Sequence, residues 1–335
     1  MRVTVSGASG TIGLACVGMA IRAGHRVRAL VRDPPAFRAR CPDERVEIVE
    51  GDVLDRAAVG LALENTDALI YCVDFAPQSF QLHWDAMHIA LESLGQRGRL
   101  VMPGNDSVYS RVGAGRVRPN APKAIRPRTA ALRAELEKAI LAERGTVVHL
   151  PEVYGPRVWK GRLARAFRRA LAGARVYFPG DLDRELEFLF VEDAARALIA
   201  PLGRVRSRGV EYTAPGFATT TPGRFISLIF KAAGRRERIE SIPVAWLKVA
   251  ALLRRDRRAS RDLLYLRERP ILFDGTRIRQ ELGWMPEVDY ADGVRRTCKW
   301  LRAERAAKPS PAPGSSPRSD PPDAPRLSTD GPEQA

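Results

Sequence analysis

The sequence predicts an α/β protein built on a doubly wound parallel sheet. Short runs of branched apolar residues alternate with longer runs that have helical spacing, and parallel strands need such a helix between them. Length and composition agree, because 335 residues with 45% hydrophobic and 28% charged residues suit a large globular domain. The expected strands are residues 1–6, 25–31, 46–49, 68–73, 100–102 and 147–150. The expected helices between them are residues 12–23, 57–63, 84–94 and 130–143.

The first expected strand runs into a loop with three glycines, Gly7, Gly10 and Gly13, and a helix follows. Glycines let the backbone approach a pyrophosphate, and the free amides at a helix N-terminus attract negative charge. This order therefore predicts a dinucleotide-binding Rossmann domain. The loop residues expected to contact the cofactor are Gly7, Ser9, Gly10, Thr11, Ile12 and Gly13.

The residues after the second and third expected strands bear on the choice between NADP and NAD. An acidic residue at the end of the second strand binds the ribose of NAD, whereas an arginine accommodates the 2′-phosphate of NADP. Arg32 lies at this point and favours NADP, while the adjacent Asp33 leaves NAD open. After the third strand, Asp52 and Val53 are expected to contact the adenine; alternatively, Asp52 forms an ordinary turn that caps the next helix.

The chain carries 55 Lys and Arg against 39 Asp and Glu, a formal charge of +16. Such a charge either attracts phosphorylated small molecules or is a solvated basic surface, and the arginines form no stripe with aromatics that would predict a nucleic-acid partner. The spacing of the cysteines and histidines predicts no metal site. We find no signal peptide and no apolar run that could span a membrane, so we expect a cytoplasmic protein without stable membrane insertion. A homodimer is left open.

Several motifs occur in an order that is typical of one family. They are the glycine loop, Gly51-Asp52, Val108-Tyr109, Val153-Tyr154-Gly155-Pro156, Phe190-Val191-Glu192-Asp193 and Leu282-Gly283-Trp284-x-Pro286. Residues 1 to about 302 thereby resemble an extended short-chain dehydrogenase/reductase of the NAD-dependent epimerase/dehydratase family. The resemblance implies a Rossmann domain at 1–160 with a returning segment at about 186–215. It also implies a smaller, split α/β substrate lobe at 161–185 and 216–306.

The second half of the chain has further helix-like runs at 163–172, 192–200, 221–233 and 244–253, and a stretch of this kind suits a mixed lobe over the carboxyl edge of the sheet. Residues 307–335 are rich in proline, serine and aspartate and cannot bury a core, so we expect a disordered tail.

The resemblance implies further contacts to the cofactor. Cys72 and Val73 end the fourth expected strand, and Pro151 and Val153 belong to a segment implied to lie under the nicotinamide. The alternative for that segment is a plain loop between the lobes. Three basic residues follow, and they either bind a phosphate or carboxylate of the substrate or are solvated. They are Arg157, Lys160 and Arg162.

The active centre of this family combines a Ser or Thr three residues before Val-Tyr with a Tyr-x-x-x-Lys motif. This chain has Asn105 at the first position and Thr129 and Arg133 in the motif, so the usual proton relay is absent. In its place we expect Asn105 to polarise a carbonyl and Arg133 to bind the nicotinamide ribose. Asp106 or Tyr109 would act as the acid or base. The alternatives are that Asn105 and Asp106 form a turn and that Tyr109 is a buried ring.

Two functions follow from these expectations. The first is an NAD(P)-dependent oxidoreductase or epimerase/dehydratase-like enzyme, linked to NADPH, that acts on a carbonyl compound or a sugar-like small molecule. The second is a non-catalytic NADP-binding sensor or scaffold protein. The substrate lobe and the segment under the nicotinamide favour the enzyme, while the missing Tyr-x-x-x-Lys motif suits both.

Overall fold

The computed structural model describes residues 1–335 except 77–78, 110–115, 124–127, 247–270 and 308–335. Most of the helix expected at 244–253 and all but the first residue of the tail expected at 307–335 lie outside the described residues. Within the ranges that are described, no helix is long and apolar enough to cross a membrane.

In the described part of the chain, seven parallel strands form one sheet in the order β10-β6-β5-β4-β1-β2-β3. The strands are β1 (Arg2–Ser6), β2 (Arg26–Val31), β3 (Val46–Glu50), β4 (Ala68–Tyr71), β5 (Arg99–Asn105), β6 (Thr146–Leu150) and β10 (Glu211–Thr213). The order reverses between β1 and β4, and ligands of open α/β sheets bind at such a reversal, beyond the carboxyl ends of the strands. The predicted doubly wound Rossmann fold is confirmed.

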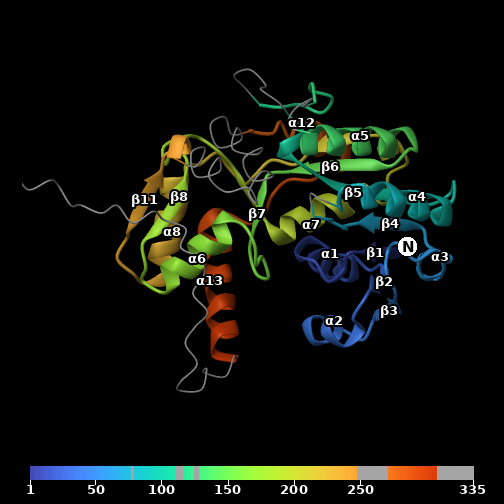
Figure 1. Ribbon diagram of the computed structural model, residues 1–335, viewed down its shortest axis with the longest axis horizontal. Helices are drawn as coiled ribbons and strands as arrows, with labels where there is room; N and C mark the ends of the chain where they lie inside the picture. The colour runs from blue at the N-terminus through green and yellow to red at the C-terminus, as the bar shows by residue number, and fades with distance from the viewer. Residues whose placement is uncertain (77–78, 110–115, 124–127, 247–270, 308–335) are drawn as a thin grey trace, which may run out of the picture.

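Helices cover both faces of this sheet (Figure 1). On one face, α1 and α7 pack against each other and share an apolar cluster with β1 and β2. On the other face, α3, α4 and α5 form a second cluster with β4, β5 and β6. Their bounds are α1 (Thr11–Arg22), α3 (Arg56–Leu63), α4 (Leu82–Leu94), α5 (Arg128–Ala142) and α7 (Val191–Ile199). Short α2 (Pro34–Arg40) begins at a proline, and the Asp33 carboxylate accepts from the Ala36 amide as its cap.

The smaller lobe has an aromatic core of its own. Its strands pair in parallel, β7 (Glu152–Tyr154) with β9 (Phe188–Phe190) and β8 (Val176–Pro179) with β11 (Ile239–Ile242). Its helices are α6 (Arg162–Leu171), α8 (Pro222–Ala233) and α13 (Tyr290–Ala307). Side chains of the β7–β9 pair alternate, so that Tyr154 and Phe188 enter the lobe core while Leu189 enters the core of the large sheet. This pair therefore joins the two cores.

The chain returns to the large sheet after residue 275. Helix α12 (Thr276–Leu282) lies against β10, and Ile278, Leu282 and Trp284 are buried in the core shared by α1, α7 and the sheet. We had expected 216–306 to belong to the lobe as a whole. The structure interleaves the two parts more than that, because an apolar helix face has no partner unless it covers this edge of the sheet.

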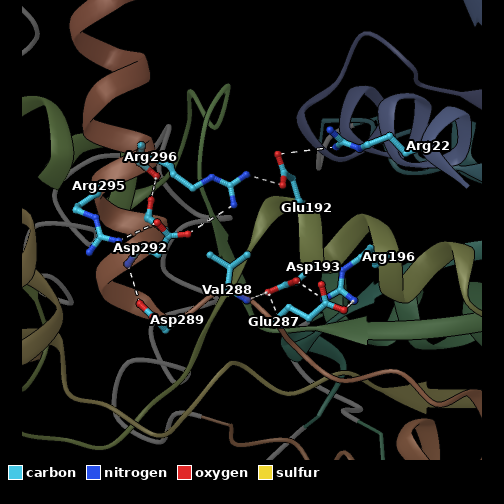
Figure 2. Close-up of polar contacts among 12 residues, drawn as sticks. Arg22, Glu192, Asp193, Arg196, Glu287, Val288, Asp289, Asp292, Arg295 and Arg296 are labelled. Atoms are coloured by element: carbon cyan, nitrogen blue, oxygen red, sulfur yellow. Dashed lines mark hydrogen bonds and ion pairs between the residues drawn. The ribbon is translucent and has the colours of Figure 1, made fainter.

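Asp193 fastens this returning segment (Figure 2). Its carboxylate is 1% exposed; one oxygen accepts from Arg196 at 2.5 Å and the other from the amides of Glu287 and Val288 at 3.2 and 3.1 Å. A buried carboxylate is stable only when such donors satisfy it. The Val-Glu-Asp motif is therefore a structural fastening between α7 and the segment that precedes α13.

The neighbouring Glu192 ties three helices together (Figure 2). Its carboxylate lies 3.9 Å from Arg22 at the end of α1 and accepts from Arg296 of α13 at 2.6 Å. The side chains of Glu192, Arg22 and Arg296 are all partly exposed, so these two ion pairs contribute little free energy. They nevertheless select one arrangement of the three helices.

Arg28 lies inside the sheet region although it is charged. It is 7% exposed, and its guanidinium donates to the carbonyls of Leu61, Ala62 and Glu64 at the end of α3 and pairs with Glu47. A cation at a helix C-terminus also meets the negative end of the helix dipole. Arg28 therefore attaches α3 to the middle of β2.

We predict that Arg28→Met lowers the free energy of unfolding by about 2–3 kcal/mol, because three carbonyl oxygens lose their donor in a buried place. Arg26→Met on the same strand is the matched control; its side chain is exposed, so we expect a change within about 0.5 kcal/mol. Urea unfolding of both variants measures the difference. Equal stability of the two variants would show that Arg28 is not the attachment we describe.

Candidate functional site

The glycine loop lies at the reversal point of the sheet, between the ends of β1 and β4. Gly7 has a φ of 69°, and a β-carbon there would lie 2.4 Å from the carbonyl oxygen of Cys72. A β-carbon on Gly13 would lie 2.2 Å from the carbonyl oxygen of Gly7. Both values are shorter than any real contact, so only glycine permits this loop to fold so tightly against β4. Cys72, expected at the cofactor site, is therefore placed against the loop.

Helix α1 starts directly behind the loop with its amides uncapped. Gly10 is its N-cap and offers no side chain, and the first turn contains no acidic residue. Free amides and the positive end of the helix dipole form an anion site, which suits the pyrophosphate of a dinucleotide. Ile12 is half-buried and packs into the core beneath this turn. The loop thus has the shape and the charge that a dinucleotide requires.

Two contacts of the loop were not expected from the sequence. The Thr11 hydroxyl donates to the carbonyl of Arg157 at 3.0 Å, which brings the segment after β7 to the start of α1. Arg40, at the end of α2, donates to the carbonyl of Ser9 at 2.9 Å. Arg40 had no signal in the sequence, since it lies 31 residues from its partner.

The polar residues beyond β2 and β3 lie together. Arg32 has an 83% exposed side chain 3.8 Å from the Asp52 carboxylate. Asp33 caps α2, and Asp52 accepts from the Leu54 amide at 3.0 Å, so both carboxylates already stabilise turns. Val53 is half-buried against the α3 side of the sheet. The adenine contact of Asp52 and Val53 stays a prediction.

Asp106 stands directly beyond β5, at the first residue of a short 3₁₀ turn, η2 (Asp106–Val108). It is half-buried, and burial together with the nearby Glu152 carboxylate raises its pKa to about 6, although Arg162 acts in the opposite direction. Asn105 is the last residue of β5, but its side chain lies outside the described part of the structure. A carboxyl that titrates near neutrality at the end of a central strand has the properties of an acid or base.

Glu152 of β7 and Arg162 of α6 both act electrostatically on Asp106. The Arg162 Nε donates to the Glu152 carboxylate at 2.5 Å, and its guanidinium lies 4.6 Å from the ring centre of Phe178. Pro151 is buried and Val153 half-buried where β6 passes into β7. Glu152 was not among the residues that we singled out, because an isolated glutamate beside a proline has no distinctive pattern.

Tyr109 is placed differently from our expectation. The side chain is fully buried, its hydroxyl donates to Glu211 at 2.5 Å and lies 3.1 Å from the His149 Nδ1. Burial and the Glu211 charge raise the pKa of Tyr109 far above its usual range. The geometry therefore favours the buried ring over the acid or base at this position.

Arg133 and Thr129 stand where the family has lysine and tyrosine. Arg133 donates to Asp74 at 3.0 Å, and His83 together with Arg133 holds the pKa of Asp74 below its usual value. The positive charge of Arg133 is therefore balanced by a carboxylate. The Thr129 hydroxyl oxygen is buried without a hydrogen-bond partner among the described residues. This pair does not reproduce a tyrosine relay.

A model of the NAD dependent epimerase/dehydratase family matches residues 3–214, which contain the whole large sheet apart from its first residue. The chain belongs to the NAD dependent epimerase/dehydratase family. Our expectation of an enzyme of this type, with a nicotinamide dinucleotide as cofactor, agrees with this membership. The family's Tyr-x-x-x-Lys motif is nevertheless absent from the chain.

The chain is also similar to curated proteins that share the name dTDP-glucose 4,6-dehydratase. A dTDP-glucose 4,6-dehydratase of Streptomyces niveus is 25% identical over 336 residues, covering 91% of this chain and 94% of that protein. Another from Streptomyces griseus is 32% identical over 154 residues, covering 46% of this chain and 41% of that protein. The second similarity is therefore local.

Solved structures show the same fold. The dTDP-glucose 4,6-dehydratase of Bacillus anthracis, in complex with NAD, has a TM-score of 0.75 at 17% identity, covering 91% of this chain and 98% of that one. The UDP-glucose 4-epimerase of Thermus thermophilus, also in complex with NAD, has a TM-score of 0.72 at 20% identity, covering 90% and 99%. At these identities the likeness extends to the arrangement of the two lobes and no further.

We predict that Gly13→Ala weakens dinucleotide binding at least about tenfold, because the new methyl group collides with a backbone oxygen that cannot move aside. Gly18→Ala in the same helix is the control. No atom lies within 4 Å of its new β-carbon, so binding should persist while the helix gains about 0.5–1 kcal/mol. Calorimetric titration with NAD(H) and NADP(H) measures both variants, and unchanged binding by Gly13→Ala would contradict the assignment of the loop.

Proposed function

We propose that this chain is an NAD(P)-dependent enzyme that modifies the sugar of a nucleotide sugar, with Asp106 as its proton donor. The observation that carries the proposal is the half-buried Asp106 carboxyl with a pKa of about 6 at the end of β5. The names of the relatives support the substrate class, since both are dTDP-glucose 4,6-dehydratases. The glycine loop supports the cofactor.

Asp106 takes the proton role because the family's usual donor is missing. Thr129 stands at the tyrosine position, and its hydroxyl does not ionise near neutrality. A carboxyl with a raised pKa keeps its proton into the mildly acidic range and can pass it to a carbonyl or to a departing hydroxyl. Glu152, which remains paired with Arg162, contributes to the raised pKa of Asp106.

The chain's own residues suffice to hold a dinucleotide. The uncapped start of α1 would bind the pyrophosphate, and Arg133, balanced by Asp74, would donate to the nicotinamide ribose. A bound dinucleotide would supply the nicotinamide ring that gives or takes a hydride. Arg157 and Lys160 are exposed on the segment that Thr11 holds at the loop, and we assign them to the phosphates of the substrate.

We also propose that the dinucleotide is NADP(H) rather than NAD(H). Arg32 is exposed beyond β2, and Arg40 at the end of α2 donates to the carbonyl of Ser9 in the glycine loop. A guanidinium beyond the second strand suits a 2′-phosphate, and Arg40 adds a second one beside the glycine loop. The solved neighbours named above are in complex with NAD, so the opposite outcome has support and requires a direct test.

We predict that Asp106→Asn lowers kcat about a hundredfold or more on the productive nucleotide sugar, because amide nitrogen cannot donate an acidic proton. In the unaltered enzyme, kcat/KM should fall as pH rises past about 6, since a donor must be protonated and its raised pKa sets that limit. A panel of dTDP- and UDP-sugars with NAD(P)(H), followed at the nicotinamide absorbance band and by product analysis, measures both.

Asp85→Asn, an exposed carboxylate on α4, is the control and should retain full activity. An Asp106→Asn variant that is as active as the unaltered protein would exclude the proton role. Tight dinucleotide binding without turnover of any sugar nucleotide or carbonyl compound would favour the non-catalytic sensor instead.

We predict that Arg32→Ala weakens NADP(H) binding about tenfold and NAD(H) binding by less than about twofold. Only NADP(H) carries a 2′-phosphate, so only its binding loses a charged hydrogen bond when the guanidinium is removed. Arg26→Ala at the opposite end of β2 should affect neither. Equal losses for the two cofactors, or tighter NAD(H) binding by the unaltered protein, would assign this enzyme to NAD.

A further inference from the structure

A cluster of ionisable side chains lies buried beneath the Asp106 turn, outside the residues that the proposed function uses. Its members come from four places in the fold and are brought together only by folding. They are Tyr109, Lys123, Glu137 of α5, His149 of β6 and Glu211 of β10. Tyr109 and His149 are fully buried, and Glu137 and Glu211 are 1% and 4% exposed.

His149 is the centre of the cluster. Its Nε2 lies 3.0 Å from a Glu137 oxygen, and its Nδ1 lies 3.3 Å from a Glu211 oxygen. A ring that carries N–H on both nitrogens can donate to both carboxylates. Gly104 of β5 makes room for this ring, because a β-carbon there would lie 2.5 Å from it. The structure thus places the imidazole ring of His149 between two acids.

Tyr109 links this centre to the Asp106 turn. Its hydroxyl donates to Glu211, while its backbone amide donates to the Asp106 carbonyl at 3.1 Å and closes the 3₁₀ turn. Lys123 pairs with the same Glu211 oxygen and lies 4.0 Å from the centre of the Tyr109 ring. Burial raises the pKa of Glu211, but His149 and Lys123 outweigh it and hold the pKa below the usual value.

Stability alone does not account for such a cluster. Burying several charges costs desolvation energy that their attraction barely offsets, and apolar replacements of similar volume are often as stable. The charge of His149 also reaches Asp106, where it opposes Glu152 and acts in the same direction as Arg162. These three are the charged groups that act on Asp106 from β6, β7 and α6.

We propose that Tyr109, His149 and Glu211 form a buried positioning cluster that holds the Asp106 turn in place from beneath and sets the electrostatic surroundings of its carboxyl. Tyr109 and His149 are thus positioning residues that act through Asp106 and touch no substrate. The inference rests on the proposed function of Asp106, so its test needs a readout that does not depend on turnover.

The test is to titrate the Asp106 carboxyl directly by NMR, in protein labelled with ¹³C at the aspartate side-chain carboxyl and assigned with Asp106→Asn. We expect a midpoint near pH 6 in the unaltered protein. His149→Gln should raise that midpoint by at least about half a unit, because it removes an imidazole that acts to lower the pKa of Asp106. Tyr109→Phe should lower it, because a released turn gives the carboxyl more water.

Tyr212→Phe is the matched control. Tyr212 lies next to Glu211 in β10 and donates to Glu281, away from Asp106, so the midpoint should not move. Tyr109→Phe keeps the volume of the buried ring. If His149→Gln does not fold, the Asp106 midpoint in Tyr109→Phe tests the inference by itself. Unchanged midpoints in the folded variants would overturn the inference, even in an active enzyme. If the midpoints shift but the protein turns over no substrate, the positioning role of the cluster is supported and the proposed function is contradicted.

Discussion

The close approach of the glycine loop to β4 is the constraint on which the rest of the site depends. Gly7 lies so near the Cys72 carbonyl that any side chain would force β1 and β4 apart. Because these two strands flank the reversal of the sheet, their spacing sets where α1 begins and where its free amides point. The segment after β7 then reaches the loop through Thr11 and Arg157. The glycine loop and the start of the smaller lobe are therefore held in a fixed position relative to each other.

Two aspartates beyond neighbouring strands show how the surroundings decide what a carboxyl does. Asp74, beyond β4, is exposed and its pKa is lowered by His83 and Arg133. Asp106, beyond β5, is half-buried and its pKa is raised by burial and by Glu152. The first stays ionised and balances a cation, while the second is able to exchange a proton near neutrality. Asp74 and Asp106 have the same side chain, so the difference between their pKa values comes from the surroundings that the fold gives them.

The sequence predicted the sheet and its helices because alternation and glycine spacing are local signals. It missed α2, since Pro34-Pro35 looks like a loop when the cap from Asp33 is not known. It missed α13, whose buried stripe of Tyr290, Val294 and Cys298 is narrow beside many charged residues. The hydrogen-bond partners of Tyr109 could not be predicted from the sequence for another reason. Glu211 lies 102 residues away, and no local pattern encodes a contact of that separation.

The last quarter of the described chain completes the first half. Ile278 and Leu282 fill the core around α1, and the amides of Glu287 and Val288 satisfy the buried Asp193. During synthesis on the ribosome, the strands and helices of the large sheet therefore emerge before the residues that cover this apolar edge and satisfy the second oxygen of Asp193. Those contacts can form only after residue 288 has been translated, so the core around α1 and α7 is completed late in synthesis.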